Sequence, residues 1–169
     1  MIGEEDMPHL ASALSADITL TSLDLSINII GAVGAQHIAE ALKVNATITQ
    51  LTLSDNEIGD VGAQHIAEAL TSNVTLTTLD VLGNRFTQEG ARAFVAVLRV
   101  NETVTQLLLY NNEIGAVGAQ HIAEALKVNA RLVSLNLRGN DLVFSSKALL
   151  REAWRHRPRY CPLRDRLAL

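Results

Sequence analysis

The strongest constraint on the fold is that one segment of this chain recurs at a fixed spacing. Residues 30–42 read IGAVGAQHIAEAL, and the segment returns at residue 58 with one change, Asp60, and at residue 114 with none. A diverged copy begins at Phe86, and every copy starts a multiple of 28 residues after the first. This period predicts a repeat array, in which each unit buries its apolar face against its neighbours.

Each unit contains two short elements with different apolar periods. Alternating leucines, such as Leu23 and Leu25 in the first unit, predict a strand with one buried face. Ala35, Ile38 and Leu42 then follow at helical spacing and predict a helix with a single apolar stripe. A helix of about ten residues is marginal in isolation, so we expect stacking on its neighbours to stabilise it.

Two series of asparagines share the period. The first series follows the strands, at Asn28, Asn56, Asn84, Asn112 and Asn140. We expect these side chains to turn the chain and to form a ladder of hydrogen bonds with the backbone of adjoining coils. The second series follows the helices, at Asn45, Asn73, Asn101 and Asn129. We expect it to supply the left-handed residue of a helix C-cap.

Other repeated positions predict how the helices begin and what fills the core. Gly34, Gly62, Gly90 and Gly118 are expected to open the helices, where a missing side chain permits close approach or an unusual backbone angle. Ser146 occupies this place in the last unit and is predicted to be its N-cap. Apolar residues are expected to plug the core beneath the turns at Ile30, Ile58, Phe86, Ile114 and Leu142.

The repeated pattern, L-x-x-L-x-L-x-x-N-x-I-G-x-x-G-A-x-x-I-A-x-A-L, resembles the leucine-rich repeat in its 28-residue, ribonuclease-inhibitor-like class. Similar repeats occur in NOD-like receptors, Ran GTPase-activating proteins and bacterial effectors. The resemblance implies an α/β fold. It would be a right-handed leucine-rich-repeat solenoid that forms a short arc, with parallel strands on the concave side and helices on the convex side.

The repeats divide the chain into three regions. Residues 1–19 form an N-terminal half-unit, with a capping helix that has no strand before it. Residues 20–142 hold the leucine-rich repeats, whose units start at residues 20, 48, 76, 104 and 132. Residues 143–169 hold the last helix, predicted over 145–156, and a basic C-terminal cap.

The C-terminal cap follows the last helix. Two prolines, Pro158 and Pro162, are expected to end regular structure there. Apolar side chains are expected to fold over the open end of the solenoid at Tyr160, Leu163, Leu167 and Leu169.

Composition limits the classes of function. The net charge of −4 argues against a surface built for nucleic acid, and the short apolar runs exclude a transmembrane helix. The acidic N-terminus predicts no signal peptide. The single cysteine, Cys161, cannot form an intrachain disulfide and is expected to be an ordinary thiol in a reducing compartment. We therefore expect a cytoplasmic protein, or one delivered into a host cytosol if it is a bacterial effector.

The chain contains no catalytic signature, because it lacks G-x-S-x-G, a phosphate-binding loop, H-E-x-x-H and paired cysteines. The sequence therefore predicts no enzyme, no cofactor and no metal. Histidine–glutamate pairs recur on the predicted helices, as at His37 and Glu40. We expect these pairs to be solvated copies of the repeat and not metal ligands.

The concave strand face is the surface on which such a fold offers binding residues. Its outward positions are small and polar in the first two units, whereas the third and fourth units bring in large apolar residues. The predicted protein-binding residues are Asp80, Leu82, Leu108, Tyr110, Asn111 and Arg138. An apolar cluster with an arginine at its edge is typical of a binding hot spot. We predict a non-enzymatic protein–protein interaction module, in a bacterial effector or a receptor-like protein.

Two alternative functions stay open at this point. The likeness to Ran GTPase-activating proteins implies a regulator of a small GTPase, and Arg85 is the one arginine among five equivalent loop positions. Residues 147–169 hold seven basic and two acidic residues, which suggests contact with an anionic ligand or a membrane surface. The partner's identity and the oligomeric state do not follow from the sequence.

Overall fold

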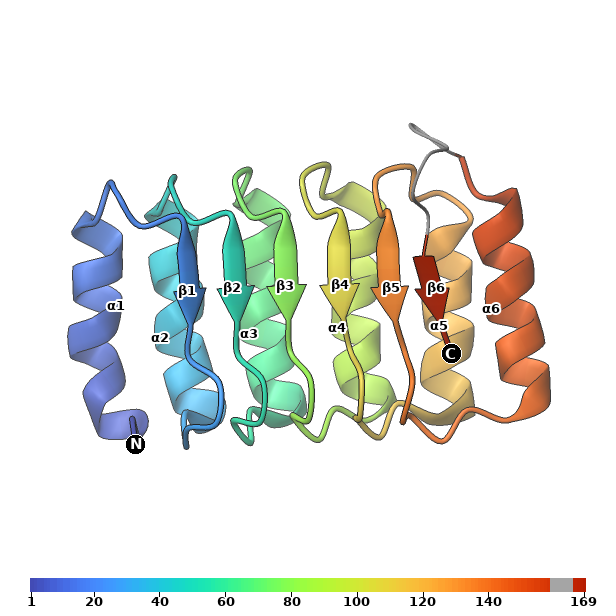
Figure 1. The fold of residues 1–169 in the computed structure, drawn as a ribbon, viewed down its shortest axis with the longest axis horizontal. Helices are drawn as coiled ribbons and strands as arrows, with labels where there is room; N and C mark the ends of the chain where they lie inside the picture. Colours follow the sequence, from blue (N-terminus) through green and yellow to red (C-terminus); the bar gives the residue numbers. More distant parts are fainter. Residues whose placement is uncertain (159–165) are drawn as a thin grey trace.

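The computed structural model describes residues 1–158 and 166–169, in which helices and strands alternate along the chain (Figure 1). A short 3₁₀ helix, Glu4–Asp6, precedes the first α-helix. The α-helices are α1 (Met7–Ala16), α2 (Gly31–Val44), α3 (Gly59–Ser72), α4 (Gln88–Val100), α5 (Gly115–Leu126) and α6 (Phe144–His156). The strands are β1 (Ser22–Asp24), β2 (Gln50–Thr52), β3 (Thr78–Asp80), β4 (Gln106–Leu108), β5 (Ser134–Asn136) and β6 (Arg166–Ala168).

The strands form one parallel sheet in chain order, β1 to β6. From β1 to β5 the register follows the repeat, so that Leu23 pairs with Leu51 and Leu51 with Leu79. The sheet makes one layer and the helices make a second layer behind it (Figure 1). Parallel neighbours joined through a helix give right-handed crossovers. The predicted fold is confirmed: a right-handed α/β solenoid with strands on the concave side and helices on the convex side.

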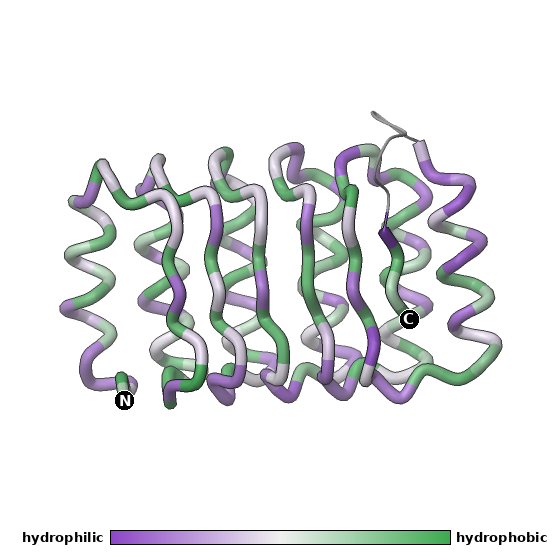
Figure 2. The backbone as a smooth tube through the Cα atoms, in the orientation of Figure 1, coloured by the Kyte–Doolittle hydropathy of each residue, from purple (hydrophilic) through white to green (hydrophobic). Residues whose placement is uncertain are grey.

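The core lies between the two layers. The strand residues Leu51 and Leu53 are 1% and 0% exposed, and Ile58 and Phe86 beneath the turns are 0% exposed. Hydrophobic and hydrophilic residues alternate along each coil, in keeping with one buried and one solvated side (Figure 2). Within residues 1–158 and 166–169, no helix is both long enough and apolar enough to cross a membrane.

The predicted ladder of strand-end asparagines is confirmed. In the middle of the ladder, Asn84 Nδ2 donates to the carbonyls of Leu53 at 2.8 Å and Leu82 at 3.0 Å. Its Oδ1 accepts from the backbone N–H of Asn56 at 3.1 Å. One buried side chain therefore satisfies backbone groups of two successive coils.

The second asparagine series does not form left-handed C-caps, so that prediction is wrong. Asn45 ends α2 with φ −70° and ψ 127°, an extended conformation that carries the chain toward the next strand. Its side chain makes the stabilising contacts instead. Nδ2 donates to the Leu14 carbonyl of the preceding helix at 2.8 Å, and Oδ1 accepts from the Ile48 N–H at 2.9 Å. The left-handed backbone is unnecessary because the amide bonds these groups directly.

The helices begin earlier than the sequence predicted. Gly31, Gly59 and Gly115 open α2, α3 and α5 with φ of 62°, 62° and 63°, so the left-handed residue comes three positions before the predicted glycines. The predicted glycines lie within the helices and allow close packing. A Cβ added at Gly62 would lie 3.0 Å from the Cβ of Ala35 on α2.

The diverged unit is joined to its neighbour by a local network. Thr87 is the N-cap of α4 and accepts from the Glu89 N–H at 3.2 Å. The Asp60 carboxylate, from α3, accepts from Thr87 N at 2.8 Å, Thr87 Oγ1 at 2.7 Å and Gly90 N at 2.9 Å. Asp60 is the one residue by which the second copy differs from the first, and it bonds the start of α4, the helix of the diverged unit.

The last unit differs from prediction at both ends. Helix α6 begins at Phe144, so Ser146 lies inside the helix, 6% exposed, and the prediction that it is the N-cap is wrong. Regular structure does not end after α6 either, because β6 adds a sixth strand to the sheet within the described residues. Leu167 and Leu169 pack against the core as expected. Predictions for Tyr160, Cys161, Pro162 and Leu163 lie outside the described residues.

Candidate protein-binding surface

The residues that the sequence singled out lie together on three consecutive coils. We call this set the concave patch: Asp80, Leu82, Leu108, Tyr110, Asn111 and Arg138. Asp80 and Leu108 are Cα partners at the ends of β3 and β4. Directly after the strands, Gly83 N donates to the Tyr110 carbonyl at 3.1 Å, and Asn111 N donates to the Arg138 carbonyl at 2.8 Å. The backbone ladder therefore fixes Leu82, Tyr110 and Arg138 side by side.

Exposure within the concave patch is uneven. Tyr110 is 39% exposed, and Asn111 and Arg138 are also exposed. Leu82 and Leu108 are half-buried, as is Asp80. Parallel strands lie about 4.8 Å apart, so side chains at one level of the sheet cover part of one another. The leucines face outward as the alternation predicted, but they offer only part of their surface.

Charged groups flank the apolar part of the patch. Asp80 Oδ1 accepts from the Leu82 N–H at 3.1 Å, which ties the carboxylate to its own turn. At the equivalent position of β1, hydrogen bonds from the Ser26 hydroxyl and N–H lower the pKa of Asp24. On the opposite side, the Arg138 guanidinium forms no ion pair with any residue that the structure describes. It is a cation available to a partner.

A polar cavity of about 350 Å³ adjoins the concave patch at the strand-to-helix loops. It is lined by Asp55, Gly83, Arg85, Asn111, Asn112, Glu113, Gly139 and Asp141. Arg85 pairs with Glu57 at 2.6 Å, and both side chains are more than half exposed. Asn111 belongs to both surfaces, so the patch continues into this acidic and polar region.

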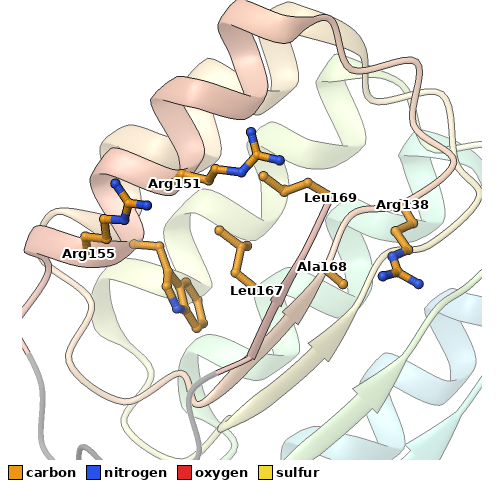
Figure 3. Close-up of a pocket in the computed structure, with 7 residues that line it drawn as sticks. Arg138, Arg151, Arg155, Leu167, Ala168 and Leu169 are labelled. Carbon is orange, nitrogen blue, oxygen red and sulfur yellow. The ribbon is translucent and has the colours of Figure 1, made fainter.

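The sequence reasoning missed two features near the C-terminal end. Phe144, the first residue of α6, is 83% exposed. A groove of about 410 Å³ also lies between α6 and β6. Arg151 and Arg155 project from α6 on one side of this groove, while Arg138 lies on the far side of β6 (Figure 3). The signal for this groove was present, because Arg151 stands where α2, α3 and α5 carry alanine.

The described part of the chain holds no group of three or more His, Cys, Asp or Glu residues that could bind a metal ion. The repeated histidines of the helices therefore come together in no such cluster within residues 1–158 and 166–169.

Comparisons with known proteins agree with the architecture. The profile of the family described as "Leucine Rich repeat" matches residues 16–39, 44–67 and 72–95. No curated protein matches the chain in sequence. Among solved structures, the "Leiomodin-1 Actin-Binding Site 2" has a TM-score of 0.72 and 22% identity, covering 90% of this chain and 88% of that one. The tropomodulin C-terminal domain of Caenorhabditis elegans has a TM-score of 0.71 and 19% identity, covering 89% and 92%.

Proposed function

Because this chain is a leucine-rich repeat protein, we propose that it is a non-enzymatic protein-binding module whose partner docks on the concave patch. The observation that carries the proposal is the placement of Leu82, Leu108 and Tyr110 on neighbouring coils in register, with Asp80 and Arg138 at the edges. Apolar anchors with a charged rim match the composition of protein interfaces.

The solenoid supports binding by holding these side chains in place before the partner arrives. Strands β3, β4 and β5, which carry the patch, are each bonded to a strand on both sides, and buried asparagines fix the loops that follow β2, β3 and β4. A surface that is already ordered loses less conformational entropy on association. Tyr110 would be the anchor, because its ring and hydroxyl serve both apolar and polar contacts. Arg138 and Asp80 would orient the partner through complementary charges.

Actin is the first partner to test, because a solved domain named for actin binding, that of leiomodin-1, shares this fold. The proposal places the module in the cytoplasm, or in a host cytosol if it belongs to a bacterial effector. A receptor-like protein is the other setting that the repeats suggest.

The test compares the partner affinity of the wild-type chain with that of a double variant that carries both Leu108→Ser and Tyr110→Ser. Isothermal titration calorimetry would use monomeric actin first and then any partner captured on the immobilised chain. We expect affinity to fall at least ~30-fold, since the loss of even one hot-spot residue costs about 2 kcal/mol or more. The control Val117→Ser removes a 49% exposed apolar side chain from α5 and should bind normally. Unchanged affinity in the double variant would reject the concave patch.

The two alternatives have their own assays. A small-GTPase regulator would accelerate GTP hydrolysis, and Arg85→Ala would abolish the acceleration; in the structure this arginine is engaged by Glu57. An anionic ligand or membrane contact through the C-terminal segment would show steep salt dependence and would be lost on deleting residues 157–169.

A further inference from the structure

The N-terminal end of the solenoid exposes apolar side chains that later coils bury. We call it the N-terminal end face: Asp6, Leu10, Ala13, Leu20 and Leu23. Ala13 is exposed and Leu10 is half-buried, whereas their counterparts Ala41 and Ile38 are 2% and 0% exposed. The outer edge of β1 pairs with no described strand. This face therefore has the shape and chemistry of a stacking surface that another coil could cover.

The C-terminal end of the solenoid carries basic residues at the helix positions that in earlier coils pack on the following helix. The alanines of α2 to α5 that pack on the following helix, such as Ala35 and Ala119, are 0% exposed, and Lys147 takes their place in α6. Arg151 and Arg155, four and eight residues after Lys147 on α6, line the groove between α6 and β6 (Figure 3). Neither arginine side chain forms an ion pair with the described residues. These three basic residues and the groove are the C-terminal end face.

Each end face supplies the half of a coil that the other lacks. Among the described elements, each of β1 to β5 is followed by the helix of its coil, whereas α1 has no strand before it and β6 has no helix after it. Strand β6 of one copy and α1 of another would therefore together make one coil. The close approach of Gly62 to Ala35 shows which helix positions meet between neighbouring coils. In α6 the counterpart of Ala35 is Lys147, and in the first coil the counterpart of Gly62 is Asp6. A contact between two small residues would become a contact between opposite charges.

We propose that copies of this chain associate head to tail, with α1 of one copy seated in the groove between α6 and β6 of another. The Asp6 carboxylate then meets the Lys147 ammonium. Leu10 and Ala13 pack on the aliphatic stem of Arg151, which keeps its guanidinium in water. The outer edges of β6 and β1, which pair with no described strand, then pair with each other and continue the parallel sheet.

Charge favours this arrangement over a symmetric dimer. Two N-terminal end faces would bring together Glu4, Glu5 and Asp6 of both copies, and two C-terminal end faces would oppose lysine and arginines. A head-to-tail contact is heterologous, so it leaves a free face at each end and grows with concentration. The association uses the ends of the solenoid, and it does not depend on the function proposed for the concave patch.

Sedimentation velocity on the purified chain at low salt and rising concentration tests the proposal. The wild type should gain mass beyond the dimer. The variants Lys147→Glu with Arg151→Glu and Glu5→Lys with Asp6→Lys should each lose association by at least ~10-fold. An equimolar mixture of the two should recover it, because each then offers the face that the other lacks. Arg92→Glu with Arg99→Glu, an equal charge change on exposed sites of α4, should behave like the wild type.

Three results would overturn the proposal. The first is a wild-type chain that stays monomeric at every concentration. Undiminished association of the Lys147→Glu and Arg151→Glu variant is another, since it would indicate pairing through two N-terminal end faces. The third is a monomeric chain that binds phosphatidylserine vesicles through Lys147 and Arg151, which assigns the groove to an anionic surface. The Leu108→Ser and Tyr110→Ser variant should still associate, so failure of the partner-binding proposal is recognised separately.

Discussion

Replacing Asn84 with alanine removes the central rung of the asparagine ladder. Its Oδ1 accepts from the N–H groups of Asn56 at 3.1 Å and Ile58 at 3.3 Å, and both residues are 0% exposed. Its Nδ2 donates to the Leu53 and Leu82 carbonyls. The Leu82 carbonyl retains a second donor, the Asp55 N–H of the preceding coil, at 2.8 Å. Among the described residues, the groups that lose their partner are therefore the two buried N–H groups and the carbonyl of buried Leu53.

The magnitude follows from these three orphaned groups. A buried polar group left without a partner costs about 1–3 kcal/mol, so three of them predict a loss of about 6 kcal/mol. Asn28→Ala is the matched control at the N-terminal rung. Asn28 is half-buried, and among the described residues its Oδ1 accepts only from the N–H of Ile2, near the surface, where water replaces the lost bond. We expect this control to cost about 1 kcal/mol.

Urea unfolding followed by far-UV circular dichroism measures both variants through linear extrapolation. Fluorescence of Trp154, at the far end of the array, provides a second probe and checks that unfolding stays cooperative. A loss below about 1 kcal/mol for Asn84→Ala, or an equal loss for the two variants, would refute the claim that the buried ladder stabilises the stacked coils.

Three further predictions follow from local contacts. Asp60→Ala removes an acceptor shared by three donors at the start of α4 and should lower the free energy of unfolding by about 1–2 kcal/mol in the same assay; an unchanged value would contradict this network. Gly62→Ala crowds the facing alanine of α2 and should lower the free energy of unfolding by about 3 kcal/mol. Gly59→Ala, where φ is +62° and the added Cβ meets open space, should lower it by about 1 kcal/mol. Calorimetry that gives the reverse order of melting temperatures would refute this prediction. Hydrogen bonds led by the Leu20 N–H lower the pKa of Asp17, so its stabilisation exists above the ordinary pKa and is lost as pH falls through the lowered one; an NMR titration that gives an ordinary or raised pKa would disprove this.

Features that depend on the repeated pattern could be predicted from the sequence. The alternation around Leu51 and the helical spacing around Ile66 each recur in several units, so one misassigned residue would not change the answer. The period also predicts that Asn56 and Asn84 are equivalent positions, and in the structure the Asn56 N–H donates to Asn84 Oδ1. Stacking requires these positions to be equivalent, and the sequence shows that equivalence directly.

Features set by a local backbone choice could not be predicted in this way. The sequence does not reveal that Asn45 bonds the adjoining coil through its side chain in an extended conformation. Strand β6 was missed because it is short and pairs out of the repeat, with Leu167 opposite Leu135 at a spacing of 32 residues. Ser146 was misplaced because a good capping residue can also lie inside a helix.

The candidate surface was predictable in position but not in accessibility. Alternation alone determined that Leu108 and Tyr110 point away from the core. Their exposure depends on how neighbouring side chains cover one another, which needs coordinates. The basic groove could have been foreseen from Lys147 and Arg151, because both replace alanines that pack against a following helix. Those substitutions distinguish an end of the array from its interior.

Hydrogen–deuterium exchange on the chain, alone and saturated with its captured partner, tests most directly whether the strand side is the binding surface. The account predicts that bound partner slows exchange in residues 80–83 and 108–111, with little change in α3, α4 and α5. Protection confined to those helices, with the strand side exchanging as in the free chain, would contradict the account.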